Sequence, residues 1–266
     1  MTIMNPQGVY NGMPPENVFF ALDDRGTQVG TGYIIYQYLP HRSPECPVSM
    51  YFEINSHPSG WYLLLGALVA RARVLREQVP DQPARLYTRL QPDQAELLAR
   101  YRESGFDCTA REALYQLFPS EGEGRIPMSC AIRQTPLNTL QEQQQLVDRL
   151  RRNDITHVDL GYLQQQMRMQ HFMALGLIQD QSLVGEVVLA GSGAGCEVVA
   201  VYIDPIFRQK GMARLLLQRS MAVMGSEGVN LFGAMFVTIS APQQRLAADF
   251  RGQERQLLGL FPQLTL

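Results

Sequence analysis

The chain has 266 residues, of which 45% are hydrophobic and 18% charged, and its formal net charge is −2. This length suits one large or two modest domains, and the lack of a basic excess argues against a broad nucleic-acid-binding surface. The longest apolar run, Trp61–Ala70, is too short to cross a membrane. The four widely spaced cysteines show no metal-binding pattern, and no secretory signal is recognisable. We therefore expect reduced thiols, no metal site and a cytoplasmic protein.

The first half of the chain reads as a hairpin followed by alternating strands and helices. Polar residues at 23–26 separate the two arms of the hairpin, and Gly105 is a typical helix stop. The predicted strands are Val18–Leu22, Gln28–Tyr38, Val48–Ile54, Arg85–Leu90 and Arg111–Phe118, and the predicted helices are Trp61–Gln78 and Asp93–Ser104.

The second half repeats this order after an additional strand and two additional helices. The predicted strands are Ile126–Ile132, Phe172–Ile178, Leu183–Ala190, Cys196–Ile203 and Asn230–Val237, and the predicted helices are Leu137–Arg152, Asp159–Arg168 and Met212–Met224. Residues 242–266 match no helix and strand clearly. The shared order indicates two domains of one fold, 1–122 and 123–266, divided within the linker-like segment Pro119–Arg125.

The segment Arg208–Ala213 joins a predicted strand to a predicted helix and contains the only lysine of the chain, Lys210. Backbone N–H groups at a helix N-terminus lack intrahelical partners, and the helix dipole adds partial positive charge there. Gly211 would let the backbone approach an anion closely. A strand, a short basic glycine loop and a helix start together predict a phosphate-binding site.

These features resemble the GNAT acyltransferases, whose pyrophosphate loop reads Gln/Arg-x-x-Gly-x-Gly/Ala. Residues 208–213, Arg-Gln-Lys-Gly-Met-Ala, fit that pattern. The resemblance covers residues 126–237 well and residues 18–118 as a weaker second copy, in which Asn55–Gly60 lacks arginine and lysine. It implies an α/β fold of two GNAT-like domains, each a mixed twisted β-sheet flanked by helices, with a degenerate N-terminal copy.

The resemblance also implies that the second half binds acetyl-CoA as co-substrate. Backbone groups of a splayed strand end, here Val201, Tyr202 and Ile203, would hold the pantetheine arm. The pyrophosphate would lie on the loop and helix start, which consist of Arg208, Gln209, Lys210, Gly211, Met212 and Ala213.

Acyl transfer to an amine needs a base, because an ammonium group is not a nucleophile. Glu197 lies eleven residues before Arg208, which matches the base glutamate in the histone-acetylating branch of the family. Regular strand alternation would place Glu197 on the face of Val201 and Ile203, opposite Tyr202.

The general acid stays open. The family often supplies a tyrosine in a Tyr-x-x-x-Gly-Phe pattern, which the first half has at Tyr101–Phe106. The second half has Phe250 at the analogous place, so it either works without a tyrosine acid, or an acid such as Tyr202 or Tyr162 substitutes, or Tyr101 of the first half acts.

The predicted function is an acetyl-CoA-dependent N-acetyltransferase that acts on an amine of a small molecule or peptide. We expect no nucleic-acid or membrane partner, and the family resemblance is compatible with a homodimer. Two alternatives stay open. One is a non-catalytic acyl-CoA-binding or sensing protein, favoured by the missing tyrosine. The other is an aminoacyl-tRNA-dependent transferase, favoured only by the arginine cluster at 149–152.

Overall fold

The structure is a computed structural model that describes residues 1–40, 43, 45–119, 129–208 and 210–266. The chain divides into two compact units, and the division is not a single cut. The first unit contains Met1–Glu112 together with Leu258–Leu266, and the second unit contains Ala113–Leu257.

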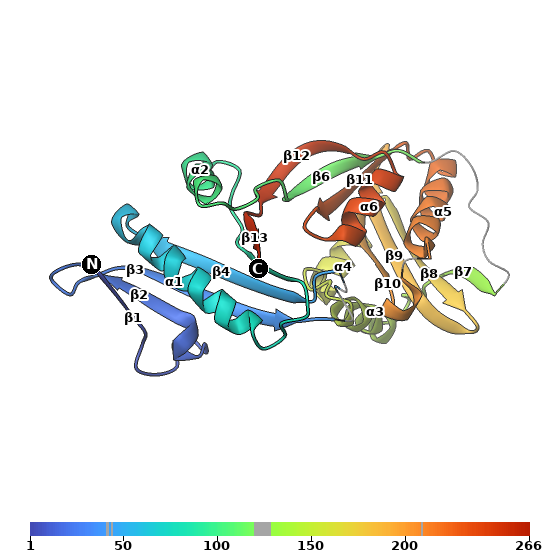
Figure 1. Ribbon diagram of the computed structural model, residues 1–266. Helices are drawn as coiled ribbons and strands as arrows, with labels where there is room; N and C mark the ends of the chain where they lie inside the picture. The colour runs from blue at the N-terminus through green and yellow to red at the C-terminus, as the bar shows by residue number, and fades with distance from the viewer. Residues whose placement is uncertain (41–42, 44, 120–128, 209) are drawn as a thin grey trace. The chain divides into compact units, whose positions relative to one another are not determined.

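The first unit is built on a sheet with the strand order β1-β2-β3-β4-β5-β13, and α1 packs on one face of it (Figure 1). Only the β4–β5 pair is parallel among the pairs of this sheet. The strands are β1 (Thr2–Met4), β2 (Val18–Leu22), β3 (Gln28–Tyr38), β4 (Val48–Ser56), β5 (Ala84–Tyr87) and β13 (Gln263–Thr265), and the helices are α1 (Pro58–Arg76) and α2 (Ala95–Glu103).

The second unit is built on a sheet with the strand order β12-β6-β11-β10-β9-β8-β7. Its elements follow in the chain order that the sequence predicted, from strand and two helices through hairpin, strand, loop and helix to strand. The strands are β6 (Arg111–Leu117), β7 (Cys130–Gln134), β8 (His171–Gln179), β9 (Ser182–Ser192), β10 (Gly195–Ile203), β11 (Leu231–Val237) and β12 (Gln253–Leu260), and the helices are α3 (Leu140–Arg152), α4 (Leu160–Gln166), α5 (Met212–Ser226) and α6 (Ala241–Asp249).

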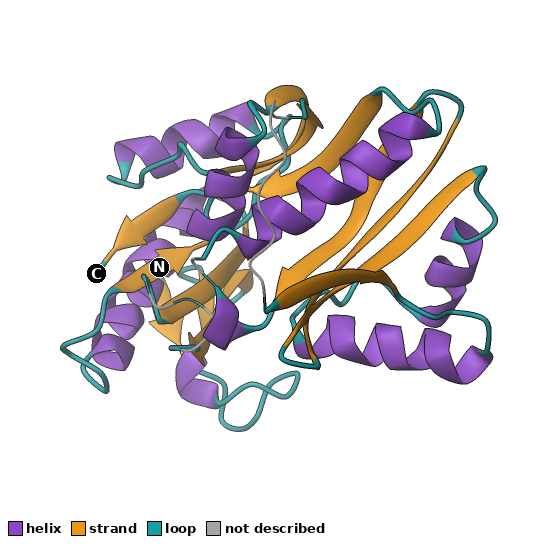
Figure 2. Cartoon of the chain, turned by 90° about the vertical axis from the view of Figure 1, so that its right-hand side faces the viewer, coloured by secondary structure: helices purple, strands orange, loops and turns teal. Residues whose placement is uncertain are grey.

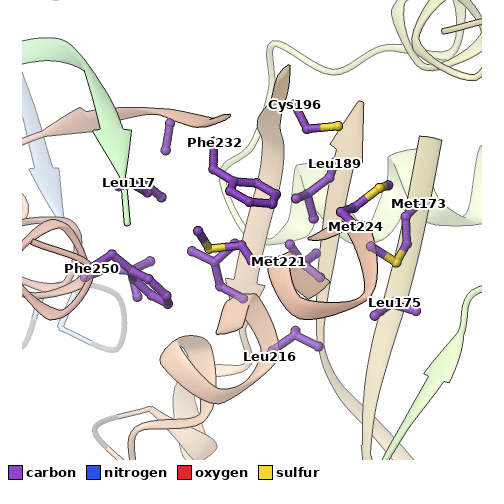
Figure 3. Close-up of a cluster of buried hydrophobic side chains, with 14 of the residues drawn as sticks. Leu117, Met173, Leu175, Leu189, Cys196, Leu216, Met221, Met224, Phe232 and Phe250 are labelled. Carbon is purple, nitrogen blue, oxygen red and sulfur yellow. The ribbon is translucent and has the colours of Figure 1, made fainter. Parts of the chain in front are cut away.

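Helices cover both faces of the long strands in the second unit (Figure 2). On one face, α3 buries Leu146, Val147 and Leu150, whereas Leu140 at its start is exposed, and a Thr139–Glu142 capping box fixes the start of the helix. On the other face, α5 and α6 bury a core that includes Phe250, Met221 and Phe232 (Figure 3). The predicted α/β class with mixed, helix-flanked sheets is confirmed.

Two segments belong to a different unit from the one that the sequence predicted for them. The strand Arg111–Phe118, predicted to complete the first half, is β6 of the second sheet, where it lies between β12 and β11. Residues 258–266, predicted as part of the second half, belong to the first unit, where β13 pairs with β5. Sequence patterns report which residues are strands, but they do not report which sheet a strand joins. The division into copies 1–122 and 123–266 stays a prediction, and its boundary falls outside the described residues.

Candidate functional site

Strand β10 forks away from β11 in the second unit. Along its β9 side, β10 is paired from Gly195 to Ile203. Along its β11 side, the parallel ladder of the described residues ends at Val198 opposite Ala234. Residues 199–203 therefore have no strand partner on the β11 side, although the Val199 carbonyl oxygen lies 3.2 Å from His157 Nε2 and the Ile203 carbonyl oxygen accepts from Arg208 Nε. Backbone groups without strand partners are sites for added hydrogen bonds. The stretch predicted to hold a pantetheine arm lies on this unpaired side.

A β-bulge in β10 changes which side chains share a face. The register against β9 shifts between Val198 and Ala200, so one extra residue is inserted in β10. Beyond the bulge, Tyr202 pairs with Glu186, and both lie on the face covered by α3. Glu197 lies on that same face, because it pairs with Ala190, which is buried in the cluster under α3 and α4. The predicted grouping of Glu197 with Val201 and Ile203 is therefore wrong, since regular alternation ends at the bulge.

The predicted phosphate loop leads into a helix whose start is open. Gly211 is the N-cap of α5 with φ 72°, and none of the described side chains caps this helix. A Cβ at Gly211 would meet no atom within 4 Å, so the left-handed backbone and not crowding requires glycine here. Arg208 Nε donates to the Ile203 carbonyl oxygen at 3.0 Å, and Lys210 Nζ lies 5.6 Å from the Phe207 ring centroid. Gln209, also predicted in this loop, lies outside the described residues.

The corresponding helix start in the first unit is closed by its own residues. His57 is the N-cap of α1 and its Nδ1 accepts from the Ser59 N–H at 3.4 Å, while Pro58 has no N–H to offer. A Cβ at Gly60 would lie within 3.4 Å of side-chain atoms of Ser56, Ala21 and Val29. Gly60 therefore serves close packing, and the degenerate loop has neither the charges nor the free amides for a pyrophosphate.

Aromatic side chains fill the first unit beyond its own strand fork. The parallel β4–β5 ladder ends at Tyr51, although β4 continues to Ser56. The next residue, Phe52, packs against Tyr101 and Phe106 at ring-centroid distances of 5.8 Å. The ring centroids of Trp61 and Tyr101 are 5.0 Å apart. Burial raises the pKa of Tyr101, and this side chain, which fits the family's acid pattern, is part of the core of the first unit.

The two tyrosines considered as substitute acids differ in their surroundings. Tyr162 of α4 is 37% exposed. Tyr202 is buried and its hydroxyl donates to Glu186 Oε2 at 2.7 Å. Burial, and next the Glu186 charge, raise the pKa of Tyr202, so this phenol keeps its proton. Phe250, at the position of the missing tyrosine, is fully buried and has no proton to give.

A buried carboxylate network beside the fork was not predicted from the sequence. The Glu186 residue is 1% exposed and its two oxygens accept from three side chains. Arg149 Nε and Nη2 donate at 2.7 and 2.9 Å, and the Thr135 hydroxyl donates at 3.0 Å, in addition to Tyr202. The pKa of Arg149 is raised, mainly by this hydrogen bonding. Arg149, which supported the aminoacyl-tRNA alternative, is therefore committed to an internal ion pair. The signal in the sequence was a lone glutamate in an apolar strand, Gly185-Glu-Val-Val-Leu189.

The described residues show neither a metal site nor a membrane segment. Among them, no three His, Cys, Asp or Glu side chains gather closely enough to hold a metal ion. Their helices also include none with the length and apolar character needed to cross a membrane.

No protein-family model and no curated protein matches the chain. Its fold is similar to a GCN5-related N-acetyltransferase from Sphaerobacter thermophilus, with 11% identity, a TM-score of 0.48 and coverage of 96% of this chain and 82% of the other. It is also similar to a tandem GNAT protein from the clavulanic acid biosynthesis pathway, at 12% identity, TM-score 0.44 and coverage of 93% and 82%. A GCN5-related N-acetyltransferase from Kribbella flavida shows 13% identity, TM-score 0.43 and coverage of 89% and 86%. These descriptions name the family that the sequence resembles.

Proposed function

We propose that the chain is an acyl-CoA-dependent N-acyltransferase that transfers an acetyl group from acetyl-CoA to an amine of a small molecule or peptide. The observation that carries the proposal is the fork in the second unit. There, β10 leaves β11 after Val198 and runs through a basic loop into the uncapped start of α5. Unpaired strand groups suit the amides of a pantetheine arm, and free helix amides suit a pyrophosphate.

The residues present fit acetyl-CoA, which when bound supplies an acyl group activated as a thioester. Backbone groups of Val201–Ile203 would hold the pantetheine arm, and Lys210, with the amides of Gly211–Ala213, would hold the phosphates. Glu197 is exposed beside the fork, where it can accept a proton from the acceptor ammonium. The free amine then forms the C–N bond as the C–S bond breaks, and the second proton that the attacking nitrogen loses balances the proton that the departing thiolate gains.

The Gly211→Glu variant should lose acetyl-CoA binding in calorimetry. The new side chain must adopt a left-handed backbone, and its charge repels phosphate at the helix start. The matched control is Gly225→Glu, near the other end of α5, where a Cβ also meets no atom within 4 Å. We expect the control to bind normally. Retained binding by Gly211→Glu would show that the phosphate site lies elsewhere.

Glu197→Gln tests the base. It keeps the size of the side chain and removes the proton acceptor, so turnover should fall by about 10²-fold while the Kd of acetyl-CoA stays unchanged. Steady-state kinetics and calorimetry on the same preparation separate the two effects. Unchanged turnover would remove Glu197 from the mechanism and leave proton transfer to water.

A second candidate function is acyl-CoA binding without catalysis. It is favoured by Phe250 at the place of the family's tyrosine and by the engagement of the Tyr202 hydroxyl with Glu186. Calorimetric binding of acetyl-CoA without acetylation of any amine in a broad panel would support this candidate against the first.

A further inference from the structure

The residue that lies opposite Glu197 on the neighbouring strand is a glycine. Gly233 of β11 pairs with Glu197 across the parallel ladder. A Cβ at Gly233 would lie 3.3 Å from Glu197 Cγ and 3.7 Å from Leu114 Cδ1. The Glu197 side chain therefore lies over Gly233 with Leu114 of β6 beside it, and the missing side chain lets both approach the backbone of β11.

Exposed apolar side chains flank this glycine. Leu231 and Met235 are two residues away from Gly233 on either side, so they project from the same face of β11. They are 51% and 46% exposed, whereas the intervening Phe232 and Ala234 are buried in the core on the opposite face. Leu231, Met235 and Leu114 thus form an apolar border, which we term the Glu197 platform. Met235 comes directly after the end of the β10–β11 ladder, at the fork itself.

The charges on and near the platform favour an acceptor with one positive charge. Glu197 is the charged residue over Gly233, and Glu112, two residues before Leu114 on the same face of β6, is paired with Arg89 Nη2 at 2.7 Å. Gln116 lies two residues after Leu114 on the same face of β6, and Arg255 of β12 donates to its side chain. A single carboxylate can neutralise one ammonium, and the Arg255 guanidinium would repel a second one. Apolar borders with few polar groups suit a hydrocarbon body.

We propose that the acceptor is a primary amine with an apolar body and a single ammonium group, and not a polyamine. The ammonium would lie at Glu197 and the hydrocarbon body on Leu231, Met235 and Leu114. This inference rests on the proposed function and adds the chemical class of the acceptor.

Competing amines test the acceptor class on the intact protein. Calorimetry first establishes acetyl-CoA binding, and mass spectrometry then measures acetylation of phenethylamine and spermidine at equal concentrations. We expect kcat/KM for phenethylamine to exceed that for spermidine by at least about tenfold. Equal or faster acetylation of spermidine overturns the inference but keeps the proposed function. Acetyl-CoA binding without acetylation of phenethylamine also counts against the inference, and no acetyl-CoA binding overturns both.

A substitution at the border tests the placement. Leu231→Lys adds a positive charge where the body should lie, so KM for phenethylamine should rise about tenfold while kcat and the Kd of acetyl-CoA stay within about twofold. Leu231→Met should behave like the parent chain. The matched control is Leu140→Lys on α3, at a residue that is 61% exposed. An unchanged KM in Leu231→Lys would overturn the platform as the acceptor site.

Discussion

Residues 111–257 produced alone should fold cooperatively, whereas residues 123–266 should not. The second fragment lacks β6, which lies between β12 and β11 in the sheet of the second unit. This fragment therefore also lacks the buried side chains of Ala113 and Leu117, and the two neighbouring strands lose their backbone partners. Loss of one large buried side chain costs about 2–5 kcal/mol, and domains are stable by only about 5–15 kcal/mol.

The fragment 123–266 has a further handicap. It carries residues 258–266, whose buried Phe261 and partly buried Leu260 and Leu264 belong with the first unit. In this fragment those apolar side chains have no core to join and would promote aggregation. The two fragments are nearly equal in length, so each is the control for the other.

Thermal unfolding by circular dichroism, with size-exclusion chromatography, checks this prediction. A sigmoidal transition and a monomeric peak are expected for 111–257 only. A cooperative transition of 123–266 at the same temperature would show that β6 is dispensable for the second unit, and the sequence-based division would then also be a structural one.

The sequence predicted the elements of the fold better than their pairing. The order around Arg208–Ala213 is the observed one, because hydrophobic periodicity and the glycine loop are local signals. The exchange of β6 and β13 depends on contacts between residues far apart in the chain, such as Thr265 with Arg85, and local patterns do not encode such pairings.

Within the candidate site, the bulge in β10 limited the sequence analysis. The run Val198-Val-Ala-Val201 gives no sign that one residue is extra, because every member is apolar and fits either face. Glu197 and Tyr202 therefore share a face that alternation had divided between them. Glu186 was overlooked because its partners Arg149, Thr135 and Tyr202 come from three other segments.

Glu186→Gln should be among the most destabilising single changes in the second unit, at about 3 kcal/mol. The substitution keeps the size of the side chain but leaves the Arg149 guanidinium, whose side chain is only 21% exposed, without its carboxylate. Removing one partner of a buried ion pair costs more than the pair contributed, because the remaining charge is uncompensated. The midpoint of thermal unfolding should fall by roughly 10 °C.

Two variants show whether charge is the cause. Thr135→Val removes one neutral donor to Glu186 and should cost only about 1 kcal/mol. The double variant Glu186→Gln with Arg149→Met removes both charges and should recover much of the lost stability. A loss in Glu186→Gln no larger than that in Thr135→Val would mean that Arg149 finds solvent or another partner.

The network also connects stability to the proposed site. Tyr202 belongs to the stretch of β10 that has no β11 partner. Its hydroxyl donates to Glu186, which in turn accepts from Arg149 of α3 and from Thr135 in the loop before α3. A strand end without a partner on one side loses order easily, because few contacts oppose its motion. Glu186 compensates from the covered face, so the backbone groups of residues 201–203 stay fixed on the open side. Tyr202→Phe removes only this hydrogen bond. It should therefore raise the Kd of acetyl-CoA in calorimetry while the midpoint of thermal unfolding changes little.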